Sequence, residues 1–521
     1  MERISRGSRA HGSSRKRETW LALLAAGLLF FFFFILFLIP PARAQNADSD
    51  LVKRLERQLQ SLDETHRLSV PDDQPISERL LLDYGGSARF GVLAVDDNFS
   101  NRRTLRETDA RVYVQAELDG AHRFYGQLRF LYDDFNAGDS FDGQGDDLRE
   151  PIGDRYWYSF DLRGLHRSRT GETLDNNFTI KVGRQFVHWG SGLALSSVLY
   201  AAVADVELGD LGLTGLYGET PRTGTVDFDG SRPSFDTNTQ RRYWGAILEY
   251  RGDPNHKPYV SYLNQTDRNQ RDTFDPFGFP TPPIARFDYD SQYILAGSQG
   301  SLNPAMLYRA EAIRELGRGL SSPLDPNGIF PTGNQTRENI RAWAGVGTVS
   351  YLVRDEENTR FDLEVAAGSG DKDRLDSSDT VGGNRSGSTD RAFNGLGYVN
   401  TGLALAPEIA NLVSVQLGVS TSPPFPGPRK DALRVGVAAF VFNKVHAGGP
   451  ISVSTSDHRF VGGEVDLFAD YHVTSDLSVS LRYGIFLPGD ALRSGQITGG
   501  ALASGQSDPR QYAYVGVTYV F

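Results

Sequence analysis

The stretch that decides the fold is QYAYVGVTYVF, residues 511–521, at the end of the chain. Its apolar positions on one side are Ala513, Val515, Val517, Tyr519 and Phe521. Alternation with a period of two is typical of a β-strand with one apolar face, because successive side chains of a strand point to opposite sides. This stretch therefore predicts a terminal strand whose last residue is aromatic.

The same alternation recurs from residue 82 to the C-terminus, in eighteen segments of roughly ten residues each. In DARVYVQAEL, residues 109–118, small or apolar residues alternate with Arg111, Tyr113, Gln115 and Glu117. About ten residues is the length of a tilted strand that crosses a bilayer. The segments therefore favour a membrane-spanning sheet.

The connections between these segments alternate in length. Short connections occur at 118–122, 208–212, 251–257, 302–305, 354–359 and 474–476. Long polar connections lie between them, at 133–153, 220–240, 267–287, 318–337, 370–408, 444–458 and 488–509. Outer-membrane barrels have this asymmetry, with short periplasmic turns and long external loops. Two connections on the short side, 163–176 and the proline-rich 421–431, are longer than this rule predicts.

Together these patterns predict an all-β protein, a transmembrane antiparallel β-barrel of eighteen strands over residues 82–521. A closed barrel is the β structure that leaves no backbone group unpaired in lipid. The terminal aromatic Phe521 is the residue that the barrel assembly machinery is expected to recognise. Outer-membrane lipid and lipopolysaccharide are the expected surroundings.

The N-terminus predicts export. Basic residues precede a long apolar stretch, 20–39, and a small-residue A-x-A pattern follows at 42–44. Residues 1–44 are therefore predicted to be a signal peptide that is cleaved after Ala44, with a retained membrane anchor as the alternative. Residues 45–81 are predicted to be a periplasmic leader, and the leucine spacing in 48–66 predicts one short helix there.

Composition excludes several other classes of protein. Hydrophobic residues make up 39% of the 521 residues, the mean hydropathy is −0.37 and cysteine is absent, which excludes a bundle of membrane helices and thiolate metal sites. A net charge of −11 argues against nucleic acid as a partner. The Asp-rich stretch 133–147 lacks the spacing of a calcium loop. A solvated loop is favoured there over ion-bridged contact with lipopolysaccharide, and no metal or cofactor is expected.

In a membrane barrel the apolar face of each strand meets lipid and the polar face lines the lumen. This rule assigns to the lumen Arg89, Arg111, Arg129, Arg155, Arg309, Arg341, Arg434 and Arg482. It also assigns there the acids Glu117, Asp161, Glu249, Glu311, Asp362, Glu364, Glu464, Asp466 and Asp470. Each charge has a simpler interpretation as part of an ion pair in the wall, but the set predicts a charged constriction that selects solutes by sign.

Three stretches carry distinctive motifs: FTIKVGRQ (178–185) after the aromatic-rich DRYWYSFDL, VAAGSGDKDR (365–374), and GGEVDLFADYHVTSDLSVSLRYGIFLPGDA (462–491). These stretches resemble the alginate export family of outer-membrane porins. The resemblance extends in architecture over residues 82–521. Its most specific motif is the last hairpin, with a Glu-x-Asp-Leu strand and a Gly-x-Phe-x-Pro-Gly-Asp-Ala ending.

This resemblance implies an eighteen-stranded barrel whose basic lumen passes an anionic uronate polymer outward, with an external and a periplasmic loop occluding the pore. It implies pore-lining roles for Arg184 and Arg482, which fall on the family's motif arginines. Arg184 shares its parity with Ile180 and Val182 on the lipid side, so it reaches the lumen only from a strand end or beyond a bulge.

Three functions can be ranked on these grounds. The first is passive export of an anionic exopolysaccharide, alginate or a similar polymer, through an arginine-lined lumen. The numerous inward acids keep another acidic polymer, a neutral polymer or a small solute open. The second function is a general or substrate-selective porin for small anionic solutes. The third, an enzyme, is disfavoured because no G-x-S-x-G or H-x-x-E-H motif occurs, and no catalytic residue is expected.

Overall fold

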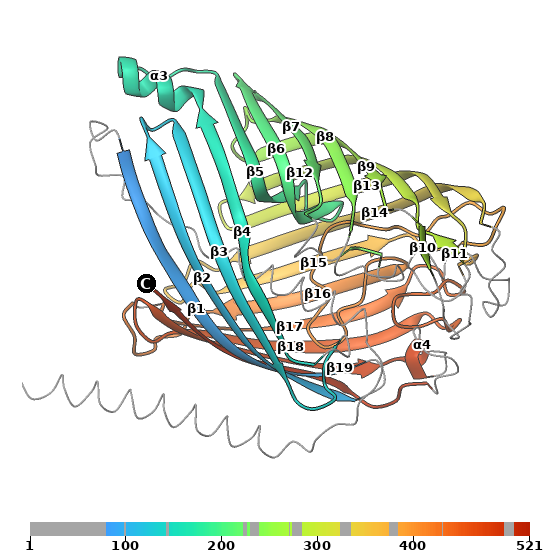
Figure 1. Cartoon of the computed structure of the whole chain (residues 1–521). Helices are drawn as coiled ribbons and strands as arrows, with labels where there is room; N and C mark the ends of the chain where they lie inside the picture. Colours follow the sequence, from blue (N-terminus) through green and yellow to red (C-terminus); the bar gives the residue numbers. More distant parts are fainter. Residues whose placement is uncertain are drawn as a thin grey trace, which may run out of the picture.

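The computed structural model describes residues 80–97, 101–141, 145–221, 227–229, 239–269, 271–273, 284–322, 335–374, 384–429, 431–493 and 505–521. Within these residues, eighteen strands form one antiparallel sheet that closes into a barrel (Figure 1). The predicted fold class and strand number are confirmed. The predicted signal peptide (1–44) and the short helix at 48–66 lie outside the described residues.

The wall consists of β1 (Leu80–Asp96), β2 (Arg102–Leu118), β3 (His122–Phe135), β4 (Asp147–Asp161), β5 (Asn177–Trp189), β6 (Leu195–Leu208), β7 (Leu211–Glu219), β8 (Arg241–Tyr250), β9 (His256–Asp267), β12 (Tyr289–Asn303), β13 (Met306–Leu320), β14 (Arg337–Leu352), β15 (Arg360–Gly368), β16 (Leu412–Thr421), β17 (Leu433–Lys444), β18 (Phe460–His472), β19 (Leu477–Pro488) and β20 (Arg510–Val520). The connections contain the hairpin of β10 (Arg271–Thr273) and β11 (Ile284–Arg286), and the helices α3 (Leu162–Thr170) and α4 (Asp490–Arg493). No helix in the described part of the chain is both long and apolar enough to cross a membrane.

The barrel closes between its first and last strands. β1 pairs with β2 along one edge and with β20 along the other, from Ser87↔Val520 to Val95↔Tyr512. At the end of this seam, the backbones of Phe521 and Gly86 exchange hydrogen bonds with N···O distances of 2.8 and 3.0 Å. A Cβ on Gly86 would lie 2.6 Å from Phe521 Cζ, so the glycine leaves room for the terminal ring. The seam leaves no strand edge open to lipid.

Strand β19 shows how the two faces of the wall differ. Leu487 is 56% exposed on the outer side, whereas its neighbour Phe486 is fully buried on the inner side. Further along the strand, Leu481 and Tyr483 are exposed and Gly484 is buried. Large apolar side chains on the outside of a closed sheet have no protein to cover them, so this surface faces lipid.

The two ends of the barrel differ in their connections. Turns such as 209–210 and 304–305 join strands at one end, here called the short-turn end, where α3 and the C-terminus also lie (Figure 1). Most connections at the opposite, long-loop end are long, and 369–411 is the longest of them. The two longer connections that the sequence predicts at the short-turn end are confirmed. One of them contains α3, and the other spans 422–432.

The buried apolar core lies inside the barrel. It combines wall residues such as Tyr293, Phe440 and Phe486 with Phe393 and Leu405 of the connection 369–411. The described residues of this connection, 369–374 and 384–411, are here called the inner loop. An eighteen-stranded barrel is too wide for its wall side chains alone to fill. The inner loop therefore supplies the other part of the core by folding into the lumen.

Two neighbouring residues of β19 test the orientation of the wall. Leu481→Arg is expected to destabilise the folded barrel by about 2–4 kcal/mol, because a charge on the lipid face must enter hydrocarbon. Ser480→Arg, on the lumen side, is expected to change stability little. Urea unfolding in lipid vesicles, followed by heat-modifiable gel mobility, measures both variants. Equal losses in the two variants would contradict this orientation.

Candidate pore site and the loop above it

Arginines of the first strands meet around one carboxylate. Nitrogen atoms of Arg89 on β1, Arg111 on β2 and Arg129 on β3 lie 3.0, 2.8 and 3.1 Å from Asp109 Oδ2. The register brings them together, since Arg89 lies opposite Asp109 and Arg111 lies opposite Arg129. Glu107 also accepts a hydrogen bond from Arg89, at 2.9 Å. Within this group the guanidinium charges outnumber the carboxylates.

Two more arginines face the lumen from β17 and β19. The guanidinium groups of Arg434 and Arg482 flank the ring of Phe468, with their Cζ atoms 5.8 and 5.4 Å from its centroid. Arg482 forms an ion pair with Asp470 at 2.8 Å, and Arg434 donates to the Ser420 hydroxyl at 3.4 Å. Both arginines stay at least partly exposed, so a solute in the lumen can reach them.

Arg89 and Arg111 of the first group line one cavity of about 410 Å³ together with Arg434 and Arg482, and this cavity is here called the basic cavity. Arg129 pairs with Asp109 but does not itself line the basic cavity. The arginines of the first strands and those of β17 and β19 come together because β20 pairs with β1 on one side and with β19 on the other. Of the described residues, five arginines and four aspartates line it: Arg89, Arg111, Arg429, Arg434, Arg482, Asp109, Asp431, Asp470 and Asp476. Asp476 belongs to a short turn and Arg429 to the connection 422–432, so the basic cavity lies toward the short-turn end.

Arg155 and Arg309 also face inward, at a distance from the basic cavity. Arg155 on β4 lies opposite Gln127, and its Cζ is 5.9 Å from the centroid of the Phe186 ring. Arg309 on β13 lies opposite Thr348 and on the same side of its strand as the buried Glu311. Their orientation agrees with the sequence pattern, but neither contributes to the lining of the basic cavity.

The lumen assignment is wrong for Arg341. This residue is exposed on the same side of β14 as Trp343, while its neighbours Ile340 and Ala342 are 1% and 0% exposed on the inner side. The physical cause is the inner loop, whose Asp390 backbone bonds to β14 at this height. Because the inner face of the wall packs against protein here, it is apolar, and polarity no longer marks the lumen side.

Arg184 on β5 is not brought to the basic cavity. In the sheet it lies opposite Tyr156 and Tyr200, whose side chains are exposed on the outer face. The Arg184 Cζ lies 5.9 Å from the centroid of the Tyr200 ring. The preceding Gly183 has a φ of 138°, so the backbone is irregular at this point. Even so, Arg184 stays on the outer register, where it is buried beside the two tyrosines.

Glu464 and Asp466 on β18 face inward, and their partners are backbone groups of the inner loop. The Glu464 carboxylate accepts the N–H groups of Leu403 and Ala404 at 2.6 Å and that of Leu405 at 2.9 Å. Asp466 accepts the N–H of Leu403 at 3.1 Å. Both acids are buried, so in this structure they anchor the inner loop.

The inner loop is also bound to distant parts of the wall. Glu315 on β13 accepts the N–H of Asn394 at 3.0 Å, and Tyr293 donates to the Asn394 carbonyl at 2.6 Å. The Leu396 N–H bonds to the Ala194 carbonyl, between β5 and β6, at 3.1 Å. Because β6, β13 and β18 are not neighbours in the sheet, a segment bound to all three crosses the lumen.

Along the barrel axis, the inner loop lies on the long-loop side of the basic cavity. Gly484 and Arg482 on β19 both face inward, two residues apart. A Cβ on Gly484 would lie 3.0 Å from the Leu403 Cβ, so this glycine makes room for the inner loop. Arg482 is nearer to the short-turn end. The basic cavity and the inner loop therefore follow one another along the barrel.

Sequence reasoning missed Glu315 as an anchor. Its parity on β13 is that of Arg309 and Glu311, so extending the alternation by four residues would have placed it inside. The surplus of inward acids was the signal for the inner loop, since a buried carboxylate needs hydrogen-bond donors. Which donors it binds could not be deduced from the strand alone.

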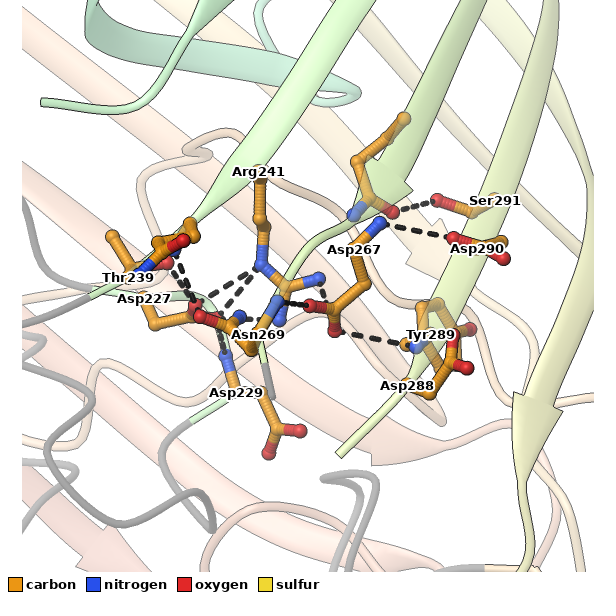
Figure 2. Close-up of polar contacts among 12 residues, drawn as sticks. Asp227, Asp229, Thr239, Arg241, Asp267, Asn269, Asp288, Tyr289, Asp290 and Ser291 are labelled. Atoms are coloured by element: carbon orange, nitrogen blue, oxygen red, sulfur yellow. Dashed lines mark hydrogen bonds and ion pairs between the residues drawn. The ribbon is translucent and has the colours of Figure 1, made fainter. Parts of the chain in front are cut away.

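A buried ion cluster joins the connections at the long-loop end (Figure 2). Arg241, at the start of β8, lies between Asp227 at 2.9 Å and Asp267 at 3.1 Å. Asp267 also accepts the Tyr289 N–H at 3.2 Å. Burial works to raise the pKa of Asp227, but the adjacent Arg241 charge outweighs it and holds that pKa below its ordinary value. In the described part of the chain, no group of three or more acidic or histidine side chains is placed to hold a metal ion.

A family model described as alginate export matches residues 225–502. The chain belongs to the alginate export family. The match contains the motifs at 365–374 and 462–491 and the whole inner loop. Family and fold are those of transport porins of the bacterial outer membrane, and not those of enzymes. The short-turn end of such a barrel is its periplasmic end.

Solved structures similar to this alginate export family member include OccK8 (OprE) and OccK5 (OpdH) of Pseudomonas aeruginosa and OccAB1 of Acinetobacter baumannii. OccK8 is 11% identical, with 84% of this chain and 98% of that chain covered and a TM-score of 0.49. OccK5 is 12% identical, and the match covers 84% of this chain and 98% of OccK5 with a TM-score of 0.45. OccAB1 is 12% identical, and the match covers 84% of this chain and 96% of OccAB1 with a TM-score of 0.46. No curated protein shows a significant match.

Removing one anchor of the inner loop is expected to open the pore. Glu464→Leu removes the acceptor of three backbone N–H groups, and a hydrogen bond to a charged group contributes about 1.5–3 kcal/mol. Single-channel recordings are expected to show an open fraction raised on the order of tenfold or more.

Glu364→Leu is the matched control for this variant. It removes another inward glutamate, which accepts from Thr348 at 3.0 Å and has no hydrogen bond to the inner loop among the contacts of the described residues. An equal increase in both variants would contradict the anchoring role of Glu464.

Proposed function

We propose that the protein is a passive export porin for an anionic polysaccharide, alginate or a polymer of similar charge. The observation that carries this proposal is the basic cavity, because a polymer entering from the periplasmic end meets its arginines before it reaches the inner loop. Guanidinium groups stay charged at physiological pH and bind carboxylates in a planar fork. They are therefore suited to draw uronate residues into the lumen.

The acids of the basic cavity support weak binding. Arg89, Arg111 and Arg482 already have aspartate partners at 3.0, 2.8 and 2.8 Å. A polymer carboxylate must compete with these aspartates, which lowers its affinity at each arginine. Weak, repeated sites let a solute enter a pore and still leave it. The arginines can thus form ion pairs within the wall and still select an anionic polymer.

A substrate-selective porin for small anionic solutes is the second candidate. It is favoured by the size of the basic cavity, because about 410 Å³ lies within the range of small-molecule sites. Block of the ion current separates the two candidates. An export porin is expected to be blocked by alginate oligomers added on the periplasmic side, whereas a small-solute porin would conduct glucuronate without such block.

Charge reversal in the basic cavity tests selection by sign. The wild-type pore is expected to prefer anions, and the double variant Arg434→Glu/Arg482→Glu is expected to lose or reverse this preference. The reversal potential in planar bilayers across a KCl gradient measures it. Arg341→Glu, which reverses one arginine charge on the outer face, is the control and is expected to keep the wild-type value. Cation preference in the wild type would count against an anionic substrate.

We propose further that residues 1–44 are the signal for export and that the mature chain begins at Gln45. N-terminal sequencing of the protein isolated from outer membranes is expected to read QNADSD. A mature chain that still carries the apolar stretch 20–39 would indicate a retained anchor. The terminal Phe521 is proposed as the contact for barrel assembly.

A further inference from the structure

A row of aromatic rings lines the wall beside the basic cavity. The rings of Tyr113 on β2 and Tyr125 on β3 have centroids 6.1 Å apart and planes inclined by 16°. The rings of Tyr125 and Trp157 on β4 lie 5.3 Å apart with planes inclined by 17°. The Lys181 ammonium on β5 lies 4.2 Å from the centroid of the Trp157 ring. The three rings are here called the aromatic row.

The aromatic row faces the lumen. Tyr125 and Trp157 lie directly opposite each other in the sheet, and their neighbours Phe124 and Tyr156 are exposed on the outer face. Tyr113 lies two residues from Arg111 on the same side of β2, and Arg111 lines the basic cavity. The aromatic row therefore continues the lining of the basic cavity along the wall toward β5.

These rings are not part of the packed interior. The buried core, taken over the described residues, includes none of the three, and each ring stays partly exposed. Carbon atoms in contact are about 3.5–4.0 Å apart, so nearly parallel rings with these larger centroid distances are offset from one another. An offset ring leaves part of its face uncovered. The lumen thus contains an accessible aromatic surface that does not serve the core.

Lys181 adds a positive charge at the end of this surface. Within the ranges that the structure describes, no carboxylate forms an ion pair with Lys181, whose charged neighbours are Arg155 and Arg123. Both arginines have acidic partners of their own, since Arg123 lies 2.9 Å from Glu117 and Arg155 lies 4.0 Å from Asp154. The Lys181 ammonium, which lies on an aromatic face, can therefore attract a nearby anion.

We propose that the aromatic row and Lys181 form a subsite for the sugar residues of an acidic polysaccharide. This inference rests on the proposed function and adds to it a site that binds the sugar rings of the polymer. One face of a pyranose ring presents C–H groups, which pack against the electron-rich face of an aromatic ring. The sugar carboxylate then lies near Lys181 and Arg155, and the hydroxyl groups stay in the water of the lumen.

The spacing of the aromatic row suits a chain of sugars. Neighbouring strands of a sheet lie about 4.8 Å apart, which is close to the length of one sugar residue in a polysaccharide. Because β2, β3 and β4 are consecutive in the wall, successive sugars can contact Tyr113, Tyr125 and Trp157 in turn. A single small solute would use one ring, so the aromatic row favours a polymer over a monomer.

Block of the ion current by an alginate hexamer, added on the periplasmic side of the full-length protein in planar bilayers, tests this subsite. Trp157→Leu and Tyr125→Leu are each expected to weaken the block by about twofold to tenfold. The reversal potential in KCl is expected to stay unchanged, because neither variant alters a charge. Trp157→Phe keeps a ring and is expected to retain most of the block.

Two controls separate the parts of the subsite. Lys181→Met is expected to weaken block by the alginate hexamer and to leave any block by the neutral maltohexaose unchanged. Tyr156→Leu makes the aromatic change on the outer face, one residue from Trp157, and is expected to behave as the wild type. An equal loss of block in Tyr156→Leu and Trp157→Leu would overturn the subsite, because the effect would not depend on the lumen face.

The outcomes also distinguish the subsite from the proposed function. Unchanged block in Trp157→Leu and Tyr125→Leu, together with altered selectivity in the arginine double variant, would overturn the subsite and leave export standing. Absence of block by the alginate hexamer in the wild-type protein would overturn both. Heat-modifiable gel mobility shows for each variant that the barrel is folded.

Discussion

Pairing of backbone N–H and C=O groups at membrane depth is the constraint on which this structure depends. Lipid offers no hydrogen bonds, so the sheet must close, and the seam between β1 and β20 closes it. Closure assigns each residue of a regular strand to lipid or to the lumen. It also brings β19 and β20 beside β1, and the basic cavity forms where these strands meet.

The width of the barrel sets the second condition. Eighteen strands enclose more space than wall side chains can fill, and in this chain residues of the inner loop pack inside the barrel toward the long-loop end. The wall supplies carboxylates to the backbone N–H groups of that loop, as Glu464 and Glu315 show. The inward acids thus have two roles. Glu464 and Glu315 hold the inner loop, whereas Asp109 and Asp470 pair with arginines around the basic cavity near the periplasmic end.

Predictions from the sequence succeeded where the reason was local. The alternation around Arg482, Arg434 and Arg89 places all three on the lumen side, because each strand is regular there. The same rule failed at Arg341, where the inner loop makes the inner face apolar. At Arg184 the motif resemblance suggested a lumen residue, but the parity of β5 keeps it on the outer register. Polarity marks the lumen only where the lumen holds water.

The sequence by itself determined the strands, their two faces, the lengths of the connections and the class of protein. These properties depend on residues two positions apart or on the next turn, so they can be deduced from short stretches. Only the tertiary structure decided that the inner loop enters the lumen and that Glu464 anchors it. It also decided that Arg89 and Arg482 share one cavity and that three aromatic rings align. These contacts join residues from separate strands, and their geometry exists only after the barrel has closed.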